Sequence, residues 1–256
     1  MLQKTKAMEY DKMKEIESGG KFVQKIGLYI HIPFCEKRCN YCAFLTFDNQ
    51  GAMIARYVTY LAKEMLLYRH SNYEVDTVYF GGGTPSYLSA EQMTYLMVQL
   101  KKVFSIAPKA EITIEMNPES VTAERLQAYL SSGINRFSMG VQSFDDRVLA
   151  VMGRLHHKKE VFEKVALMKE MECQDFNLDL MFSNPYQSRK IWQSDIALAL
   201  ALDPPHLSCY SLIYKPHTKF YQWRENGIID GVEDEEDRAM YHYLTRHITI
   251  IGLPSI

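Results

Sequence analysis

Short runs of β-branched and aromatic residues alternate with longer amphipathic segments from residue 25 onward. The short runs have the length and composition of β-strands. They lie at residues 26–32, 77–82, 111–117, 135–141, 176–182 and 206–212. The longer segments repeat their apolar residues at helical spacing, as at residues 57–70, 89–104, 122–133 and 191–202. The pattern therefore predicts six β/α units in order.

The spacing of the predicted strands favours parallel pairing. Successive strands lie about 30 residues apart, which suits right-handed crossovers through a helix. Ser89 and Thr122 stand where helix N-caps are expected, and Gly133 follows a predicted helix end. Six units are too few for the closed eight-stranded barrel. The fold class is therefore α/β, and periodicity alone leaves a partial barrel and a doubly wound open sheet as alternatives.

The composition is that of a globular chain without a strong charge. Of its 256 residues 47% are hydrophobic, and the formal net charge is -2 with a pI near 6.5. This length supports one large domain or a tightly coupled pair. The near-neutral balance gives no electrostatic reason to bind nucleic acid or an anionic membrane, and no run approaches the ~20 apolar residues of a membrane span. We expect small, roughly neutral partners.

The N-terminal sequence and the cysteine count both argue against export. The first twenty residues alternate charges with scattered methionines and lack the apolar core of a secretory signal, so a cytoplasmic location is expected. We expect residues 1–24 to form an N-terminal extension, helical up to Gly19 and Gly20. An odd count of five cysteines does not suit a disulfide framework. Cys173 and Cys209 stand alone in apolar surroundings and are predicted to be buried thiols.

The other three cysteines are crowded into eight residues. Cys35, Cys39 and Cys42 form the pattern CxxxCxxC directly after the first predicted strand. Both candidate architectures place an active site at this end of a strand. Closely spaced thiolates of this kind hold iron–sulfur clusters, and three ligands on a 4Fe–4S cube leave one iron open to a small molecule. The alternative is a zinc site completed by His31 or by a remote histidine.

The cysteine pattern resembles the signature of radical S-adenosylmethionine (SAM) proteins. The stretch YIHIPFCEKRCNYCAF is similar to one branch of them, the oxygen-independent coproporphyrinogen III dehydrogenases and the related heme chaperones. Further motifs follow in the family's order and spacing: VYFGGGTPS, IEMNPESVT, GINRFSMGVQSFDD, MGRLHH, FNLDLM and DPPHLSCYSL. The resemblance covers residues 26–220. It implies a partial (β/α)6 barrel of the TIM type with the cluster at its mouth.

The resemblance also implies how SAM would be bound. The backbone at Gly82, Gly83 and Thr84 would receive its methionine amino group, where a tight turn is the plain alternative. Contacts to SAM are further implied for four polar residues and for two tyrosines that flank the cluster: Glu115, Gln142, Arg154, Asp179, Tyr29 and Tyr41. An arginine suits a carboxylate, and the acids suit ribose hydroxyls or the amino group. The alternative for the polar residues is an internal ion-pair network, since buried charges need partners.

Several positions depart from the family and favour its chaperone-like branch. The dehydrogenases carry another cysteine two residues after the last ligand, where this chain has Phe44, and this argues against decarboxylation of coproporphyrinogen. Ala43 replaces an acidic residue, and the loop after residue 182 reads SNPYQS where a glycine-containing loop is expected. His156 and His157 are predicted to lie on a loop or a pocket rim rather than to ligate heme.

These observations predict a radical SAM barrel at residues 25–222 and the truncated start of a C-terminal region at residues 223–256. A heme chaperone-like protein of heme or porphyrin metabolism is the favoured function, with a 4Fe–4S cluster, SAM and heme as candidate cofactors. A radical SAM enzyme, such as an oxidative decarboxylase or methyltransferase, is the second candidate, and a zinc-stabilised module is a distant third. Either radical function needs an electron donor such as flavodoxin or ferredoxin. The final substrate, the reductant and the oligomeric state stay open.

Overall fold

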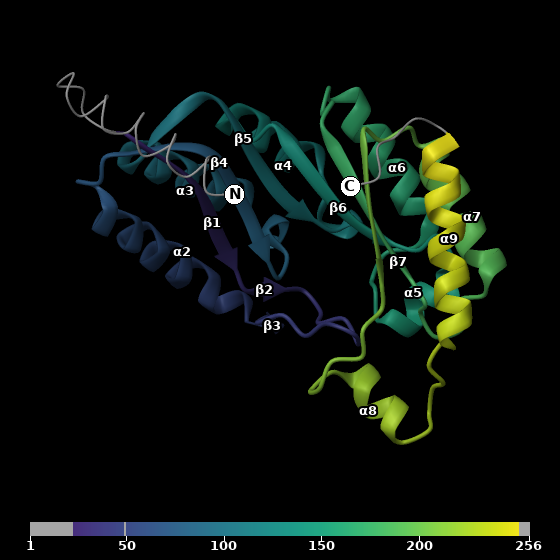
Figure 1. Cartoon of the computed structure of the whole chain (residues 1–256). Coiled ribbons are helices and arrows are strands. Elements are labelled where there is room, and N and C mark those ends of the chain that lie inside the picture. Colours follow the sequence, from purple (N-terminus) through teal and green to yellow (C-terminus); the bar gives the residue numbers. More distant parts are fainter. Residues whose placement is uncertain (1–22, 49, 251–256) are drawn as a thin grey trace, which may run out of the picture.

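A six-stranded parallel sheet forms the centre of the protein (Figure 1). The computed structural model describes residues 23–48 and 50–250. In the order in which they neighbour one another, the strands are β1 (Gln24–Ile32), β4 (Tyr73–Gly82), β5 (Ser105–Met116), β6 (Arg136–Gln142), β7 (Phe176–Phe182) and β8 (His206–Ser211). Each strand pairs in parallel with the next, so all the C-terminal ends meet at one edge of the sheet.

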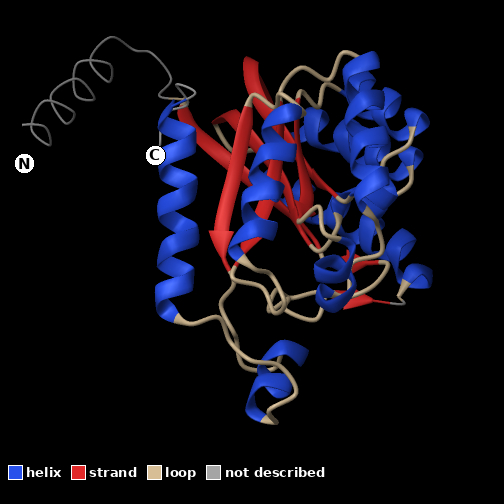
Figure 2. Cartoon of the chain, turned by 90° about the vertical axis from the view of Figure 1, so that its right-hand side faces the viewer, coloured by secondary structure: helices blue, strands red, loops and turns tan. Residues whose placement is uncertain are grey.

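Helices connect the strands and flank the curved sheet (Figure 2). They are α2 (Gly51–Met65), α3 (Ala90–Val103), α4 (Ala123–Ser132), α5 (Asp146–Met152), α6 (Lys158–Glu170), α7 (Arg189–Ala201), α8 (Lys219–Glu225) and α9 (Asp234–Ile250). Figure 1 shows α2 beside the β1 edge, and α7 with α9 at the other end of the sheet. The arrangement is a half-barrel, the partial TIM barrel that the family resemblance implied.

The two faces of the sheet differ in polarity because side chains alternate along each strand. On β5, Ile112 and Ile114 are almost fully buried against the helices, whereas Glu115 lies on the other face and is only partly buried. The outward apolar side chains form the main core, in which Phe137 and Trp192 are completely buried. The alternation along the strands therefore places polar side chains on the inside of the half-barrel.

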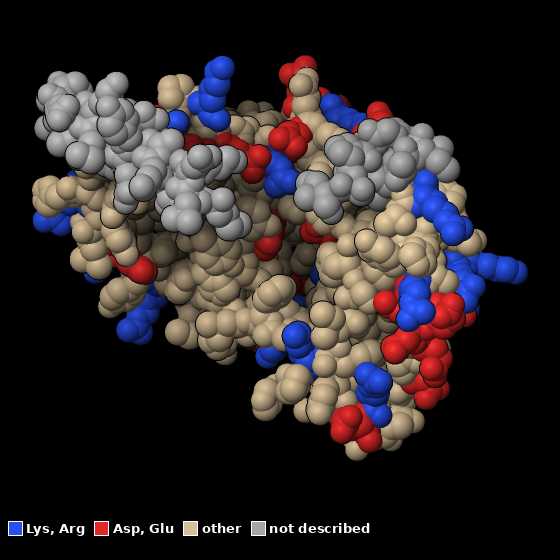
Figure 3. Space-filling model, viewed as in Figure 1, with Lys and Arg blue, Asp and Glu red and all other residues tan. Residues whose placement is uncertain are grey.

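Helix α9 packs against α7 and joins the main core. Met240 and Leu244 are buried there, and Trp192 donates from Nε1 to Met240 O at 3.0 Å. The acidic run EDEED supplies the first turn of this helix, as predicted, where its charges complement the helix dipole. Figure 3 shows acidic residues gathered where α9 begins, with lysines and arginines among them.

Most predicted elements are present, although several begin earlier than expected. Ser89 and Thr122 cap α3 and α4 through their side chains, and Gly133 ends α4 with a φ of 90°. β5 begins at Ser105 rather than at residue 111, and α2 begins at Gly51 rather than at residue 57. No side-chain cap precedes α2, so the usual start signal is missing there.

Two predictions about the ends of the chain stay predictions. The helical extension falls at residues 1–24, of which residues 1–22 lie outside the described part. The domain boundary predicted between residues 222 and 223 also stays a prediction, because the packing of α9 on the half-barrel does not test it. No helix in the described ranges is both long enough and apolar enough to cross a bilayer.

Candidate functional site

The three crowded cysteines lie on a segment that follows β1, residues 33–48, called here the cysteine loop. Hydrogen bonds attach it to neighbouring elements. Two short strands, β2 (Phe34–Cys35) and β3 (Phe47–Asp48), pair in parallel and bring the two ends of the loop together. In its middle, Asn40 is 7% exposed and donates from Nδ2 to Val151 O at 2.8 Å. The backbone N–H of Phe220 donates to Asn40 O at 2.9 Å. The loop is therefore held by both α5 and α8.

The three crowded thiols lie on this loop as free cysteines. Thr84 donates from Oγ1 to Cys35 Sγ at 3.5 Å, and Arg154 donates from Nη1 to Cys39 Sγ at 3.4 Å. Burial raises the pKa of Cys35 to about 11 and also raises the pKa of Cys42, and the neighbouring thiols add to both shifts. Burial thus opposes formation of the thiolates that a metal centre needs, and a bound metal would offset this cost because a coordinating thiol is deprotonated.

One form of the zinc alternative uses His31 as the fourth ligand, but both ring nitrogens of this side chain lie against other groups. Its Nδ1 lies 3.0 Å from Tyr29 OH and its Nε2 lies 3.0 Å from Leu45 O. Within residues 23–48 and 50–250, no three Cys, His, Asp or Glu side chains converge closely enough for a single metal ion. In the described residues the loop therefore forms no closed single-ion site with His31.

The glycine-rich segment after β4 lies directly against the cysteine loop. Thr84 N donates to Phe34 O at 2.8 Å. A Cβ on Gly83 would lie 2.7 Å from Phe34 O and 3.0 Å from Cys35 Sγ, so a larger residue does not fit. Gly82 has a φ of 118°, which favours glycine. This segment therefore brings bare backbone next to a cysteine rather than only turning the chain.

Glu115 lies on the inner face near the end of β5. Its Oε1 accepts from Tyr79 OH at 2.8 Å, and its Oε2 accepts from Gly82 N at 3.1 Å. Burial raises the pKa of Glu115 above its ordinary value, and the two donors offset this only in part. Tyr29 stacks on Tyr79 with 6.1 Å between ring centroids and is 61% exposed. Hydroxyl and backbone donors hold Glu115, which does not favour the ion-pair alternative.

Asp179 occupies a similar place on β7. Its Oδ1 accepts from Asn177 Nδ2 at 2.6 Å, and its Oδ2 accepts from Ser138 Oγ at 3.2 Å. Burial raises the pKa of Asp179, and its hydrogen-bond donors oppose the shift without cancelling it. Both acids therefore lie on the polar inner face among neutral donors, a setting suited to a ligand with hydroxyl or amino groups.

Gln142 ends β6, and Arg154 lies on the loop after α5. Gln142 has a φ of 70° beside a register shift in β6 and accepts from Tyr210 OH at 2.7 Å. Arg154 donates from Nη2 to Asn117 Oδ1 at 2.7 Å. Its Nε is buried and has no hydrogen-bond partner among the described residues. The guanidinium therefore places a positive charge next to Cys39.

Tyr41 provides a packed aromatic surface beside the thiols. Its ring centroid lies 6.3 Å from that of Phe220, and it packs against a small apolar cluster at the mouth. Burial strongly raises the pKa of its phenol, and the Cys39 thiol adds to the shift. Phe44 is instead 70% exposed.

Two contributors to the site were not predicted in these roles. Asn117 directly follows β5 in IEMNPES, and a polar residue at the C-terminal end of a strand is the signal that marks it. His156 lies on a loop, as predicted, but it is 1% exposed and therefore does not form a rim. Its Nε2 lies 3.1 Å from Val141 O, and its Nδ1 lies 3.4 Å from Glu119 Oε2. A buried carboxylate partner from another loop cannot be found from sequence spacing.

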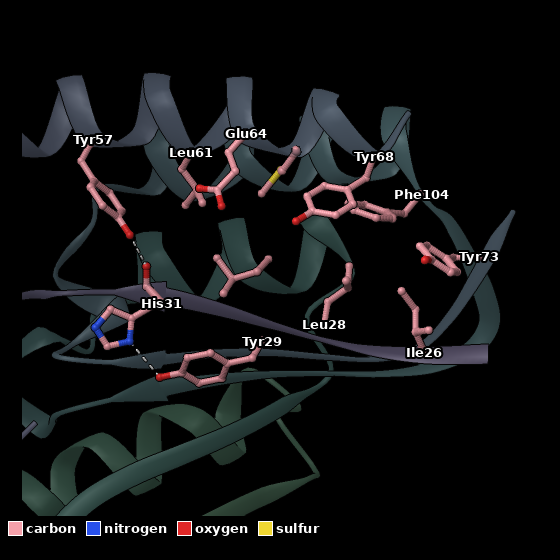
Figure 4. A pocket seen from close by; sticks show the side chains of 12 residues that line it. Ile26, Leu28, Tyr29, His31, Tyr57, Leu61, Glu64, Tyr68, Tyr73 and Phe104 are labelled. Carbon is pink, nitrogen blue, oxygen red and sulfur yellow. Dashed lines mark hydrogen bonds between the residues drawn. The ribbon is translucent and has the colours of Figure 1, made fainter. Parts of the chain in front are cut away.

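A separate pocket opens between β1 and α2 (Figure 4). Its volume is about 350 Å³, and Leu61 and Tyr68 line it on the α2 side opposite Leu28. Tyr57 OH donates to His31 O at 2.6 Å at one end, whereas the ring of His31 turns to the other side of the strand. The pocket therefore shares β1 with the candidate site but not its carboxylates.

The fold and the site define a class of protein: an α/β half-barrel with a cysteine loop at the C-terminal ends of its strands and buried carboxylates on its inner face. A model of the radical SAM superfamily matches residues 29–194 of this sequence. The chain belongs to the radical SAM superfamily.

Comparison with individual proteins supports the resemblance to one branch of that superfamily. The chain is 35% identical over 242 residues to the heme chaperone HemW of Synechocystis sp., covering 91% of this chain and 58% of the relative. It is 36% identical over 228 residues to HemW of Bacillus subtilis, and this match covers 88% of this chain and 60% of the relative. The structure also resembles that of a radical SAM enzyme, coproporphyrinogen III oxidase (HemN) from Escherichia coli. The TM-score is 0.81 at 25% identity, and the match covers 90% of this chain and 54% of that one. The chain thus spans between half and two thirds of these proteins.

Proposed function

We propose that the protein holds a 4Fe–4S cluster through Cys35, Cys39 and Cys42 and binds SAM at the open iron. The observation that carries this proposal is that a hydrogen-bond donor reaches two of the three thiols, from Thr84 to Cys35 and from Arg154 to Cys39. Such donors to sulfur tune iron–sulfur centres. When bound, the cluster supplies an electron for the reductive cleavage of a carbon–sulfur bond of SAM.

The remaining contacts to SAM follow from the donors and acceptors of the mouth. Arg154 would receive the carboxylate, and the backbone at Gly82, Gly83 and Thr84 would receive the amino group. The acids on the inner face would accept from the ribose hydroxyls. Three further side chains would border the adenosine and methionine parts: Gln142, Tyr29 and Tyr41. The protein's part is to orient SAM and to exclude water from the mouth.

We further propose a heme chaperone-like role in the cytoplasm. Two features support this: the relatives of 35% and 36% identity are named heme chaperones, and Phe44 stands where the dehydrogenases carry a further cysteine. A radical SAM enzyme acting on a porphyrin or another substrate is the second candidate, favoured by the likeness to coproporphyrinogen III oxidase. Both roles use a one-electron donor such as flavodoxin or ferredoxin, and the first uses heme as its ligand.

Iron and sulfide analysis of anaerobically reconstituted protein tests the cluster assignment. The unmodified chain is expected to be brown, with about four iron and four sulfide per chain. Cys35→Ala, Cys39→Ala and Cys42→Ala should each lose both. Cys173→Ala and Cys209→Ala are the matched controls and should keep both. A control that loses its iron while a loop variant retains it would refute the assignment.

Heme titration followed by absorbance, beside product analysis with coproporphyrinogen III, separates the candidate roles. Heme binding without release of deoxyadenosine would support the carrier. Release of deoxyadenosine that depends on the porphyrin would support the enzyme. A colourless protein that contains zinc would refute both and support the structural module.

A further inference from the structure

The side chain of Asn117 connects the hydrogen bond that reaches Cys35 to the hydrogen bond that reaches Cys39. Asn117 Nδ2 donates to Thr84 Oγ1 at 3.1 Å, and Thr84 Oγ1 donates to Cys35 Sγ at 3.5 Å. Asn117 Oδ1 accepts from Arg154 Nη2 at 2.7 Å, and Arg154 Nη1 donates to Cys39 Sγ at 3.4 Å. A continuous chain of hydrogen bonds therefore runs from one thiol to the other through Asn117.

Hydrogen-bond chemistry allows this chain only one orientation of the amide. An arginine side chain has donors and no acceptor, so the oxygen of Asn117 must face Arg154. The amide nitrogen then faces the hydroxyl of Thr84, whose single proton is left for Cys35. Turning the amide over would place a donor against the guanidinium donors. Both ends of the Asn117 side chain are therefore committed.

The surrounding backbone is arranged to admit this side chain. A Cβ on Gly140 would lie 3.0 Å from Asn117 Oδ1 and 3.4 Å from Arg154 Nη2, so glycine leaves room here that a larger residue would crowd. Glu119 Oε2 lies 3.4 Å from Nδ1 of the buried His156. The loop after β5 therefore approaches the loop that carries Arg154 at two places, and Asn117 makes the hydrogen bond between them.

We propose that Asn117 is a positioning residue for the cluster, which sets Cys35 and Cys39 relative to each other and keeps a donor directed at each sulfur. This inference rests on the proposed function, because it concerns a bound cluster. Hydrogen bonds to the sulfurs of an iron–sulfur centre influence its reduction potential, since they stabilise the more negative, reduced state. Asn117 therefore acts on the potential without touching the cluster.

Asn117→Ala in the full 256-residue chain tests this role. The midpoint potential of the reconstituted cluster, measured by redox titration with electron paramagnetic resonance, should shift to a more negative value. Loss of iron to a chelator should become about tenfold faster, as is common when a residue that orients a metal ligand is removed. Thr84→Val removes only the Cys35 branch and should give a smaller shift. The shift of the double variant should be smaller than the two single shifts added together, because both changes break one chain.

Asn135→Ala is the matched control. Asn135 likewise uses both ends of its amide, but it does so with backbone groups at the N-terminal end of β6: it accepts from Ile112 N at 2.8 Å and donates to Ala110 O at 2.9 Å. Its loss should lower the melting temperature and leave the potential unchanged. If the unmodified chain takes up no iron, the proposed function fails.

A normal cluster in the unmodified chain, with the same potential and chelator rate in Asn117→Ala, would overturn only the positioning role. If Asn117→Ala does not fold, Thr84→Val decides the question by the same two measurements. An unchanged potential in Thr84→Val would then overturn the inference.

Discussion

Single residues on the inner face of the half-barrel combine two carboxylates that burial makes costly to ionise with a guanidinium beside a thiol. The pKa values of Glu115 and Asp179 are both raised, first of all by burial. Arg154 donates to Cys39 Sγ and to Asn117 Oδ1, and its buried Nε has no hydrogen-bond partner among the described residues. Perturbed acids gathered near a cation in this way are typical of binding sites.

Glu115→Gln is expected to weaken SAM binding by about 10- to 100-fold while the melting temperature stays near that of the unmodified chain. Arg154→Leu should also weaken SAM binding, but it should lower the melting temperature as well, because Asn117 Oδ1 and Gly140 O lose their donor. Calorimetry on cluster-loaded protein measures the affinity, and circular dichroism measures the melting. Arg147→Leu is the control, because its side chain is 81% exposed and pairs only with Asp145 on the surface. Unchanged affinity together with a loss of several kcal/mol of stability would instead support an internal ion-pair role.

Asp195 in α7 should give the stability a distinct pH dependence. It is 1% exposed, and burial raises its pKa from 3.8 to about 6 although Phe144 N and Ser143 Oγ donate to it. The folded state therefore binds this proton more readily than the unfolded state. The stabilising contribution is complete below pH 3.8 and is lost as the pH rises through about 6.

The free energy of unfolding, measured by urea titration between pH 4 and about pH 7, should decline in the unmodified chain more steeply than in Asp195→Asn. Asp230→Asn, at an exposed carboxyl, should keep the full decline. Equal slopes in Asp195→Asn and in the unmodified chain would show that another group titrates.

At the scale of elements, α9 fixes the ends of two neighbouring strands. Asp237 in its first turn accepts hydrogen bonds from Ser183 Oγ at 2.5 Å, just after β7, and from Ser211 Oγ at the end of β8. Ser183 has a φ of 61°, which is unusual for a residue other than glycine. It opens the loop SNPYQS, where the family resemblance leads one to expect a glycine. The contact from α9 offsets the cost of this backbone conformation.

Asp237→Ala is expected to lower the free energy of unfolding by about 2 kcal/mol, because two hydroxyl donors lose a charged acceptor. Chemical denaturation measures the change. Asp234→Ala, an exposed acidic residue in the same turn, should cost no more than about 0.5 kcal/mol. Equal losses of unfolding free energy in the two variants would refute the proposed stabilisation of the strand ends by Asp237.

Across the whole molecule, two apolar clusters have different tasks. The main core lies between the sheet and its helices, whereas a smaller cluster at the mouth joins α5, β7 and α8. Phe220 is completely buried in the smaller cluster, and Tyr41 of the cysteine loop packs against it. The cysteine loop is therefore coupled to the fold through the apolar side chains beneath it as well as through hydrogen bonds.

Phe220→Ala should cost about 3–5 kcal/mol of stability and speed the loss of iron to a chelator, because the cavity lies beside the cysteine loop. Phe176→Ala removes an equally buried ring from the main core, at the opposite end of β7. It should destabilise the fold by a similar amount and leave the rate of iron loss from folded protein unchanged. Equal rates of iron loss in the two variants would contradict the coupling.

The sequence by itself determined the class of this protein. The alternation of strand-like and helical periods predicted six parallel units, and the spacing of three cysteines marked one loop as a candidate metal site. Side-chain caps at Ser89 and Thr122 were predicted correctly because a cap is a local interaction. These features depend on residues within a few positions of one another, and such short-range chemistry is visible in the order of amino acids.

Only the tertiary structure decided which distant side chains meet. Arg154 reaches Cys39 across 115 positions of the chain, and Asn117 joins them to Thr84. The burial of His156 beside Glu119 and the contact of Asp237 with two strand ends arise in the same way. Strand register and the curvature of the sheet set these distances, and many different sequences share one periodic pattern while placing such side chains differently. Periodicity therefore identifies the half-barrel's elements, whereas packing assembles its site.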